Sequence, residues 1–197
     1  MSSREPAPWV TTSTVLQRLK SFDDQDAWQQ FVRRFQRPIE AYARKRGLSE
    51  SDAEDAEQEA LAAFAQSFRD GGYERERGRL SRWLFGIVHH RIEQQRDRMA
   101  RRAPADSVAW SQLEDQQSPD GVWTEIWERS MLEQCVAAAR DELHGTTRRV
   151  FEMLVLEGRS VEDAMSETGL SRNAVYIAKH RALTRVRGLL ADCDEVD

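Results

Sequence analysis

Apolar side chains recur every three or four residues along most of the chain, which is the period of an α-helix buried along one face. A first helix is predicted by a stripe that consists of Ala27, Trp28, Phe31, Val32, Phe35, Ile39, Tyr42 and Ala43. Pro38 lies inside this stripe and has no amide hydrogen to donate, so a bend or a restart of the helix is expected there.

Two further helices are predicted before residue 103. The first is opened by a capping box of Ser51 with Glu54 and is ended by Gly71-Gly72. Its apolar face consists of Ala53, Ala60, Leu61, Phe64 and Phe68. The second extends to about Arg102, along a stripe of Leu80, Trp83, Leu84, Ile87, Val88 and Ile92.

The helical pattern breaks between Ala103 and Asp120, where Pro104, Pro119 and many Gln, Ser and Asp residues are typical of a linker. Helical stripes then resume with Val122, Trp123, Ile126, Trp127, Met131, Val136 and Leu143, and later with Val150, Phe151, Leu154 and Val155. No alternating strand pattern longer than a few residues occurs in the sequence. The expected fold class is all-α, with two helical domains (1–103 and 120–191), a flexible linker (104–119) and an acidic tail (192–197).

Charge is segregated along the chain, although the net charge is only -5. The segment 50–59 carries six acidic residues and no base, the segment 79–102 carries seven arginines, and the segment 148–187 is basic again. Two basic blocks separated by acidic ones predict two places for phosphate and separate surfaces for protein partners. The chain has no apolar run near the roughly 20 residues that span a bilayer and no secretory pattern at its start, so a cytoplasmic protein without membrane contact is expected.

Candidate metal and catalytic residues are few. Cys135 and Cys193 lie 58 residues apart without metal-ligand spacing, so unbonded thiols are expected rather than a disulfide or a zinc site. His89, His90 and Glu93 lack a further ligand at zinc spacing, and neither a phosphate loop nor a nucleophile motif occurs in the sequence. The sequence therefore predicts no metal, no cofactor and no enzymatic activity.

The strongest mechanistic motif lies between Ser160 and Arg187. Ser160 with Asp163 forms a capping box that opens a short helix, and Gly169 suits the left-handed turn that ends it. Ser171 then caps a second helix. This order is the layout of a helix-turn-helix, whose second helix enters the major groove of DNA.

The second helix of this pair is expected to have one polar face. Its inward positions are Val175, Ala178, Ala182 and Val186, and its outward positions are Arg172, Asn173, Tyr176, Lys179, His180 and Arg181. Arginine reads guanine edges, asparagine reads adenine, and both lysine and arginine reach phosphates. The alternative is an ordinary helical hairpin with a solvated face, but the absence of acidic residues between Arg172 and Arg187 favours DNA binding.

The arginine-rich helix before residue 103 has Tyr73, Trp83 and Phe85 as aromatic neighbours. Bases of melted DNA stack on such rings while arginines hold the backbone. The alternative is that Trp83 belongs to the core and that the arginines form a solvated helix end, where cations favour the helix dipole. Both interpretations remain open on the residues alone.

Taken together, these motifs resemble the sigma-70 family of transcription initiation factors, and within it the extracytoplasmic-function (ECF) subfamily. The segment 52–60 (DAEDAEQEA) resembles the signature of sigma region 2.2, and the segment 78–87 (GRLSRWLFGI) resembles the opening of regions 2.3 and 2.4. The segments 143–151, 157–163 and 169–171 are similar to region 4.1 running into the region 4.2 helix-turn-helix.

The resemblance implies a partner for each charged surface. Docking on the clamp helices of the largest subunit of core RNA polymerase would use Asp52, Glu54, Asp55, Gln58 and Glu59. The minus-ten element of promoter DNA would be contacted by Tyr73, Arg79, Arg82, His89, His90 and Arg96. The minus-thirty-five element would be contacted by Arg148, Arg149, Arg172, Asn173, Tyr176, Lys179, His180 and Arg181. An anti-sigma factor or another regulator of this kind would hold the protein inactive.

The sequence departs from the family's pattern at several positions, which puts its promoter sequence in doubt. His89-His90 stand where the family often has Arg-Asn, and Glu57 takes a place that is usually apolar. The alternative function is a stand-alone helix-turn-helix regulator that dimerises through Trp123 and Trp127. Such a regulator has no evident use for the acidic segment, which therefore favours the sigma factor.

Overall fold

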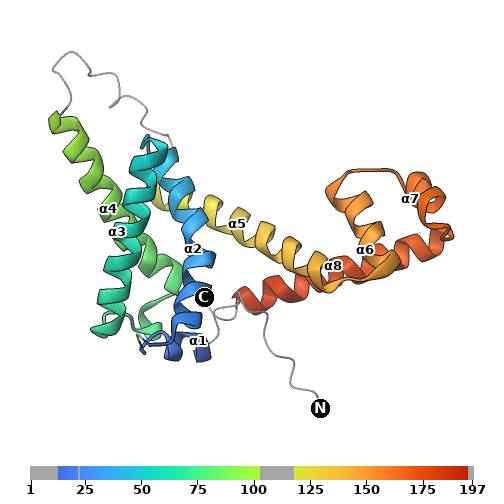
Figure 1. The fold of residues 1–197 in the computed structure, drawn as a ribbon, viewed down its shortest axis with the longest axis horizontal. Coiled ribbons are helices and arrows are strands. Elements are labelled where there is room, and N and C mark those ends of the chain that lie inside the picture. The colour runs from blue at the N-terminus through green and yellow to red at the C-terminus, as the bar shows by residue number, and fades with distance from the viewer. Residues whose placement is uncertain (1–12, 22, 103–117, 195–197) are drawn as a thin grey trace. The chain divides into compact units, whose positions relative to one another are not determined.

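The computed structural model describes residues 13–21, 23–102 and 118–194, and every regular element in these ranges is a helix (Figure 1). This confirms the all-α prediction. The elements are α1 (Ser13–Arg18), α2 (Gln25–Lys45), α3 (Glu50–Arg69), η1 (Arg75–Arg77), α4 (Leu80–Arg102), α5 (Pro119–Glu142), α6 (Gly145–Phe151), η3 (Glu152–Leu156), α7 (Val161–Thr168) and α8 (Arg172–Asp194). Most of the predicted linker (104–117) and the end of the acidic tail (195–197) lie outside the described residues.

Two features of the helices differ from the sequence-based expectation. α2 continues through Pro38 without a restart, because the flanking Phe35 and Ile39 are buried and their packing offsets the missing hydrogen bond. The predicted capping box of Ser51 is wrong. The N-cap of α3 is Ser49, whose extended backbone lets its hydroxyl accept from the amide of Asp52 at 3.2 Å.

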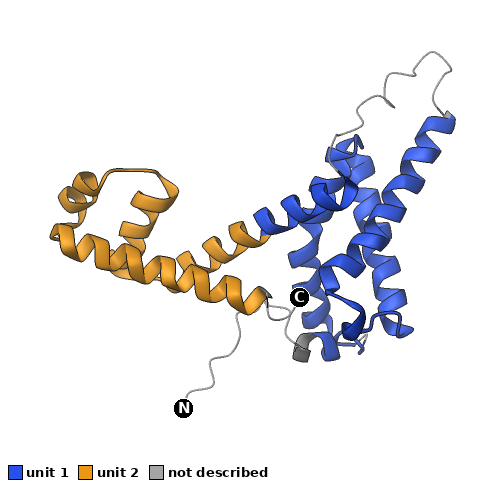
Figure 2. Ribbon diagram, turned by 180° about the vertical axis from the view of Figure 1, so that it is seen from behind, with its two compact units in different colours: residues 1–130, 196–197 blue, residues 131–195 orange. Residues whose placement is uncertain are grey.

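The chain divides into two compact units, residues 1–130 with 196–197 (unit 1) and residues 131–195 (unit 2), which Figure 2 colours separately. The division lies inside α5, between Ser130 and Met131, whereas the sequence-based boundary lies at residue 120. The first half of α5 thus belongs to unit 1 because its apolar side chains complete the core of that unit.

Aromatic stacking holds unit 1 together. α3 packs against both α2 and α4. At the centre of the unit the ring of Phe31 lies 4.1 Å from that of Phe64 and 4.5 Å from that of Phe35. The ring of Trp83 lies 5.2 Å from that of Phe64, so this tryptophan is packed against the core.

The tryptophan stripe of α5 belongs to the same core. Trp123 is 3% exposed and its ring lies 5.8 Å from that of Tyr42 and 5.6 Å from that of Phe85. Trp127 stacks on Phe35 at 4.9 Å and also lies 5.4 Å below the guanidinium of Arg34, a cation–π contact. These contacts pack Trp123 and Trp127 against the core of unit 1, with Trp123 buried and Trp127 half-buried.

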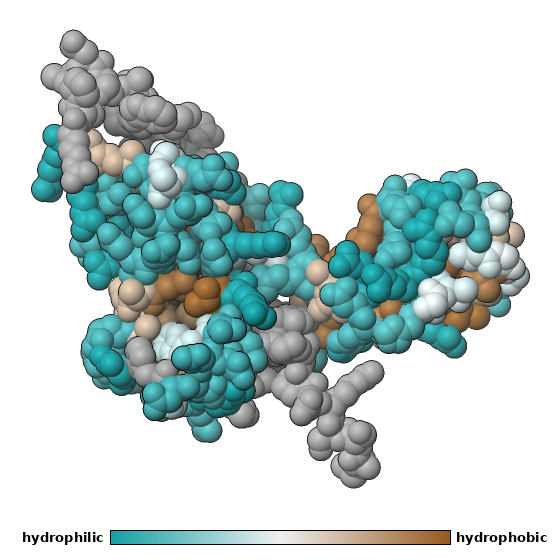
Figure 3. All heavy atoms as spheres, in the orientation of Figure 1, coloured by the Kyte–Doolittle hydropathy of each residue, from teal (hydrophilic) through white to brown (hydrophobic). Residues whose placement is uncertain are grey.

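One core cluster of unit 2 is formed by Val150, Met153, Ala164, Val175 and Ala178. These residues join α6, η3, α7 and the first turns of α8. The face of the molecule drawn in Figure 3 is mostly hydrophilic. None of the described helices has an apolar stretch long enough to cross a bilayer.

The packing of α5 can be tested selectively, because all six tryptophans precede Met131 and their fluorescence therefore follows unit 1. We expect Trp123→Ala to lower the free energy of unfolding of unit 1 by about 3–5 kcal/mol, the usual effect of deleting a buried aromatic ring. The measurement is urea denaturation followed by tryptophan fluorescence. Glu125→Ala is the matched control, since Glu125 is exposed and lies in the same half of α5, within unit 1. Equal small effects of the two substitutions would contradict the packing described.

Candidate functional site

One face of α3 carries a continuous strip of acidic and amide side chains. Glu54, Asp55, Gln58 and Glu59 are exposed, and Asp52 at the first turn is half-buried. The spacing puts them on one side of the helix, while the opposite side is buried in unit 1. The strip was predicted for polymerase docking, and the fold leaves it open to a partner.

The two ends of this strip are held by α4. Glu59 forms an ion pair with Arg98 at 3.2 Å, and Asp52 accepts a hydrogen bond from Gln95 at 3.5 Å. Within the described ranges, Glu54, Asp55 and Gln58 have no side-chain partner. The middle of the strip therefore keeps its charge uncompensated.

A second polar face lies on α4 and on the residue before it. Arg79, Arg82, Gly86 and His90 are exposed and follow one another at helical spacing. Gly86 presents no side chain in the middle of this face, and a Cβ added there would meet no atom within 4 Å. The face is thus cationic at its start and open to close approach at Gly86.

Arg96 and His89 were predicted for the same surface but are bound within unit 1. Arg96 pairs with Glu93 at 2.9 Å, and Arg46 donates to the same carboxylate at 2.9 Å. Burial alone would raise the pKa of Glu93, but the two guanidinium groups hold that pKa below its usual value. The carboxylate therefore stays charged and fixes both arginines.

His89 lies against the core rather than in solvent. Its Nδ1 is 3.0 Å from the hydroxyl of Tyr42, and its ring stacks on Phe85 at 5.5 Å. Burial raises the pKa of Tyr42 to about 12, so the phenol keeps its proton and can donate it to Nδ1. Burial likewise lowers the pKa of His89, which favours the neutral ring. His90, by contrast, is exposed and contacts Gln94 at 2.8 Å.

Tyr73 closes the loop between α3 and α4. Its ring lies 5.3 Å from that of Trp83 and 6.1 Å from that of Phe68, and its hydroxyl donates to the carbonyl of Gly78 at 3.3 Å. The side chain is half-buried, so one edge of the ring is left at the surface of this loop.

Unit 2 contains the predicted pair of helices α7 and α8, with each of its expected caps. The capping box of Ser160 with Asp163 is present, and Gly169 ends α7 with φ 70° in the left-handed region. Ser171 accepts from the amide of Ala174 at 3.3 Å and so caps α8. On α8 the inward side chains Val175, Ala178, Ala182 and Val186 are all buried, as expected.

The outward face of α8 is polar. Arg172, Asn173, Tyr176, His180 and Arg181 are exposed, and Lys179 is half-buried. Arg172 is paired with Glu162 of α7. In the part of the chain that the structure describes, the other five residues have no side-chain hydrogen bond or ion pair. This face therefore offers donors to a ligand from one side of a single helix.

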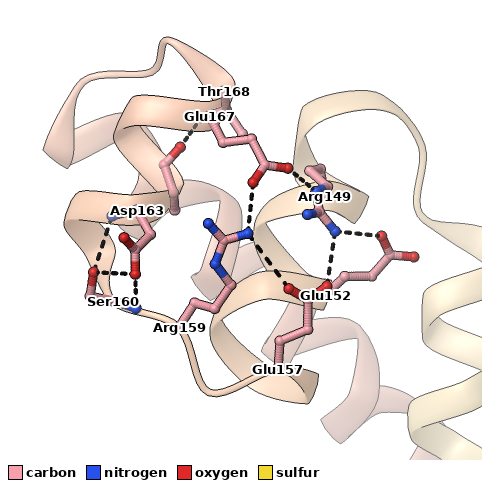
Figure 4. A network of polar contacts seen from close by, with 9 residues as sticks. Arg149, Glu152, Glu157, Arg159, Ser160, Asp163, Glu167 and Thr168 are labelled. Atoms are coloured by element: carbon pink, nitrogen blue, oxygen red, sulfur yellow. Dashed lines mark hydrogen bonds and ion pairs between the residues drawn. The ribbon is translucent and has the colours of Figure 1, made fainter.

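Arg149, one of the two predicted DNA contacts on α6, lies in an ion-pair network (Figure 4). Arg149 contacts Glu167 at 2.5 Å and Glu157 at 2.9 Å, while Arg159 contacts Glu167 at 2.7 Å. Arg148 is paired separately with Glu152 at 3.0 Å. The network ties α6 to the end of α7, so Arg149 helps to set the position of the turn before α8.

Comparison with known proteins identifies the central part of unit 1. Residues 31–102 match the model of the sigma-70 region 2 family. This segment is a sigma-70 region 2 domain. It contains most of α2 and all of α3 and α4, and hence both the acidic strip and the arginine-bearing face.

Other comparisons add little. No curated protein matches the sequence. A solved structure described as CnrH in complex with the cytosolic domain of CnrY is 23% identical, covers 90% of this chain and 96% of that chain, and has a TM-score of 0.37. At this level the likeness supports no inference about the present chain.

Within the region 2 domain, the contacts that sequence reasoning missed are those between residues far apart in the chain. Two hydrogen bonds, one between Tyr42 and His89 and one between Arg46 and Glu93, each join residues 47 positions apart. Spacing within one helix does not predict such contacts. Glu57 did carry a signal, because it occupies an apolar position of the helix pattern. It is 5% exposed, and burial, followed by repulsion from Glu40 and Glu54, raises its pKa.

The buried Glu57 makes the region 2 domain sensitive to pH. Because the folded-state pKa is raised, protonation stabilises the fold, and this stability is present at low pH and is lost as the pH rises through the folded pKa. We expect Glu57→Gln to increase the free energy of unfolding at pH 7 by on the order of 1 kcal/mol. This gain in the free energy of unfolding should disappear near pH 4.

This effect is measured by urea denaturation with tryptophan fluorescence at several pH values between 4 and 7. Asp55→Asn is the control, since Asp55 is exposed on the same helix and does not contribute to the raised pKa of Glu57. A stability difference between Glu57→Gln and the unmodified chain that does not vary with pH would rule out the raised pKa as its cause.

Proposed function

We propose that the chain is a sigma factor of the ECF subfamily, which binds core RNA polymerase in the cytoplasm and directs it to specific promoters. The observation that carries this proposal is a region 2 domain followed, in the same chain, by a separate unit with the layout of a helix-turn-helix. In this role the chain acts by binding, and the chemistry of transcription belongs to the polymerase.

The acidic strip of α3 is proposed to dock on the clamp helices of the largest subunit. Its support is electrostatic: Glu54 and Asp55 are exposed and have no cationic partner in the described residues, so a basic surface can approach without breaking existing ion pairs. Asp52 and Glu59 would contribute from the ends of the strip.

The face of α4 is proposed to contact the minus-ten element. Arg79 and Arg82 supply charge for phosphates, and Gly86 leaves room for a DNA backbone to come close to the helix. His90 is better placed for this contact than His89, which is engaged by Tyr42. Tyr73, at the surface of its loop, would stack on an unpaired base.

Unit 2 is proposed to act as sigma region 4 and to contact the minus-thirty-five element. The exposed face of α8 supplies Asn173, Tyr176, Lys179, His180 and Arg181 as unoccupied groups, and Arg172 would have to leave Glu162 to reach a base. Arg149 is proposed to position this helix from within its network, while Arg148 lies beside it at the edge of the unit. A protein regulator of the anti-sigma kind is implied by the family resemblance alone.

The second candidate is a stand-alone helix-turn-helix regulator. It is favoured by one observation, that the polar residues of α8 are exposed or half-buried on a single helix. It predicts strong binding to duplex DNA by the chain alone, whereas a sigma factor needs core polymerase to bind its promoter.

Transcription in vitro from sheared genomic DNA, with core polymerase and with or without this protein, distinguishes the two candidates. New discrete start sites that share a two-part upstream motif are expected. If no new start sites arise and the chain does not bind core polymerase, the sigma factor proposal fails and the stand-alone regulator is preferred.

Reversing one charge in the middle of the acidic strip should remove polymerase binding. We expect Asp55→Arg to weaken binding to core polymerase at least about tenfold, because it places a cation against a basic partner surface. The control is Glu125→Arg, the same change at an exposed position of α5. Affinity is measured by titration of labelled protein with core polymerase, and circular dichroism checks the fold. Equal affinities of the two variants would exclude docking through α3.

Removing the first arginine of α8 should weaken promoter use selectively. We expect Arg172→Ala to cost about 1–3 kcal/mol on promoters that carry the base it reads, and much less on others. Glu162→Gln is the matched control, because it releases Arg172 from its ion pair and should preserve or improve promoter use. Transcription from a set of single-base promoter variants measures both. An equal loss on every promoter would mean that Arg172 contacts phosphate only.

A further inference from the structure

The two cysteines of the chain meet inside unit 2 although they are far apart in sequence. Cys135 of α5 and Cys193 of α8 are separated by 58 positions, and their Sγ atoms lie 3.8 Å apart. The side chains are 0% and 3% exposed. The pattern of the sequence predicts two unbonded thiols here, because the cysteines share no motif spacing.

A second contact shows that this meeting follows from the register of two helices. Glu142, at the end of α5, accepts hydrogen bonds from Arg185 of α8, one of them at 2.7 Å. Moving back seven residues from Glu142 leads to Cys135, and moving forward eight residues from Arg185 leads to Cys193. Steps of nearly equal length in opposite directions mean that the two segments run antiparallel for about two helical turns.

The residues between these two contacts are buried as well. Ala139 of α5 and Val186 and Leu189 of α8 lie on the faces that carry the contacts. The cysteine pair thus lies at one end of the segment over which α5 and α8 face each other, and the ion pair lies at the other end. Cys135 and Cys193 each lie on a regular helix. The backbones of these two helices, rather than the side-chain rotamers alone, therefore place the two sulfur atoms near each other.

We propose that Cys135 and Cys193 form a reversible disulfide that joins α5 to α8 in unit 2, with a peroxide as the oxidant. The bond requires the sulfurs to close from 3.8 Å to about 2.05 Å, which rotation about the side-chain bonds can supply between neighbouring helices. This inference is independent of the proposed function, since it concerns the scaffold of unit 2 and not its partners.

The chemistry balances with one peroxide for each disulfide. The thiolate of one cysteine attacks a peroxide oxygen, which breaks the O–O bond and gives a sulfenic acid, and the hydroxide released takes up a proton to become water. The second thiolate then attacks the sulfenic sulfur, forms the S–S bond and displaces hydroxide, which takes up the proton that the second thiol has lost and becomes a second water. The two cysteines are oxidised and the peroxide is reduced. A dithiol regenerates the two cysteine thiols by two exchange steps and is itself oxidised to a disulfide.

Cys193 is the residue that a peroxide would reach first. It lies in the last turn of α8, which ends at Asp194, and helix ends open more readily than helix interiors. Cys135 lies within α5 and would act as the resolving thiol after the turn closes again. The exposed polar residues from Arg172 to Arg181 lie at the other end of α8, so the disulfide leaves that face unobstructed.

The test compares the full chain folded in buffer with the same chain in concentrated urea, each equilibrated in a series of glutathione redox buffers. Remaining thiols are alkylated and the products are measured by intact mass spectrometry. We expect an intramolecular disulfide in the folded chain, formed with an equilibrium constant roughly 30- to 1000-fold higher than in urea, because the fold holds the thiols together. Hydrogen peroxide should give the same product.

Two variants with a single cysteine serve as controls for the intramolecular disulfide. Cys193→Ala and Cys135→Ala each leave one thiol, and neither should form an intramolecular product. The oxidised unmodified chain should unfold at a higher temperature than the reduced chain, as followed by circular dichroism. An equilibrium constant in buffer equal to or below that in urea would overturn the proposal, as would a product made only of glutathione adducts or of dimers joined between chains.

Discussion

The stacking of Phe31 on Phe64 is the contact on which the geometry of the region 2 domain depends. It joins α2 to α3, and Trp83 extends the same stack to α4. Helices this polar gain most of their stability from packing rather than from intrinsic propensity. Because the aromatic rings fix which side of α3 faces inward, they also fix which side presents Glu54 and Asp55 to solvent.

The charged side chains divide into those that hold the fold and those left for partners. Glu93 binds both Arg46 and Arg96, and Arg149 is surrounded by carboxylates from three segments, so these groups position helices. A single exposed ion pair contributes little, but a network that crosses several elements restrains their relative placement. A charge count alone treats all arginines alike, whereas the contacts separate Arg149 from Arg181.

Local signals in the sequence predicted local structure well. The bounds of α4, the capping box of Ser160 and the inward face of α8 follow from spacing, because each depends on neighbours within one or two helical turns. The cap of α3 was misplaced because Ser49 and Ser51 both have an acidic residue three positions later, and only the backbone conformation selects Ser49. The partners of His89 and of Cys135 were missed because they depend on helix register, which periodicity does not specify.

α5 shows most clearly why a domain boundary is hard to place from composition. Its sequence has one uninterrupted helical stripe, but Trp123 and Trp127 pack in the core of unit 1, while Cys135 and Ala139 are buried in unit 2. Proline and polar residues mark where a helical pattern breaks, but they do not indicate which core the next helix packs against. A fragment that ends at residue 103 would therefore uncover Phe35 and Tyr42, the partners of the two tryptophans. Any study of the region 2 domain in isolation should keep the chain through Ser130, so that its aromatic core remains complete.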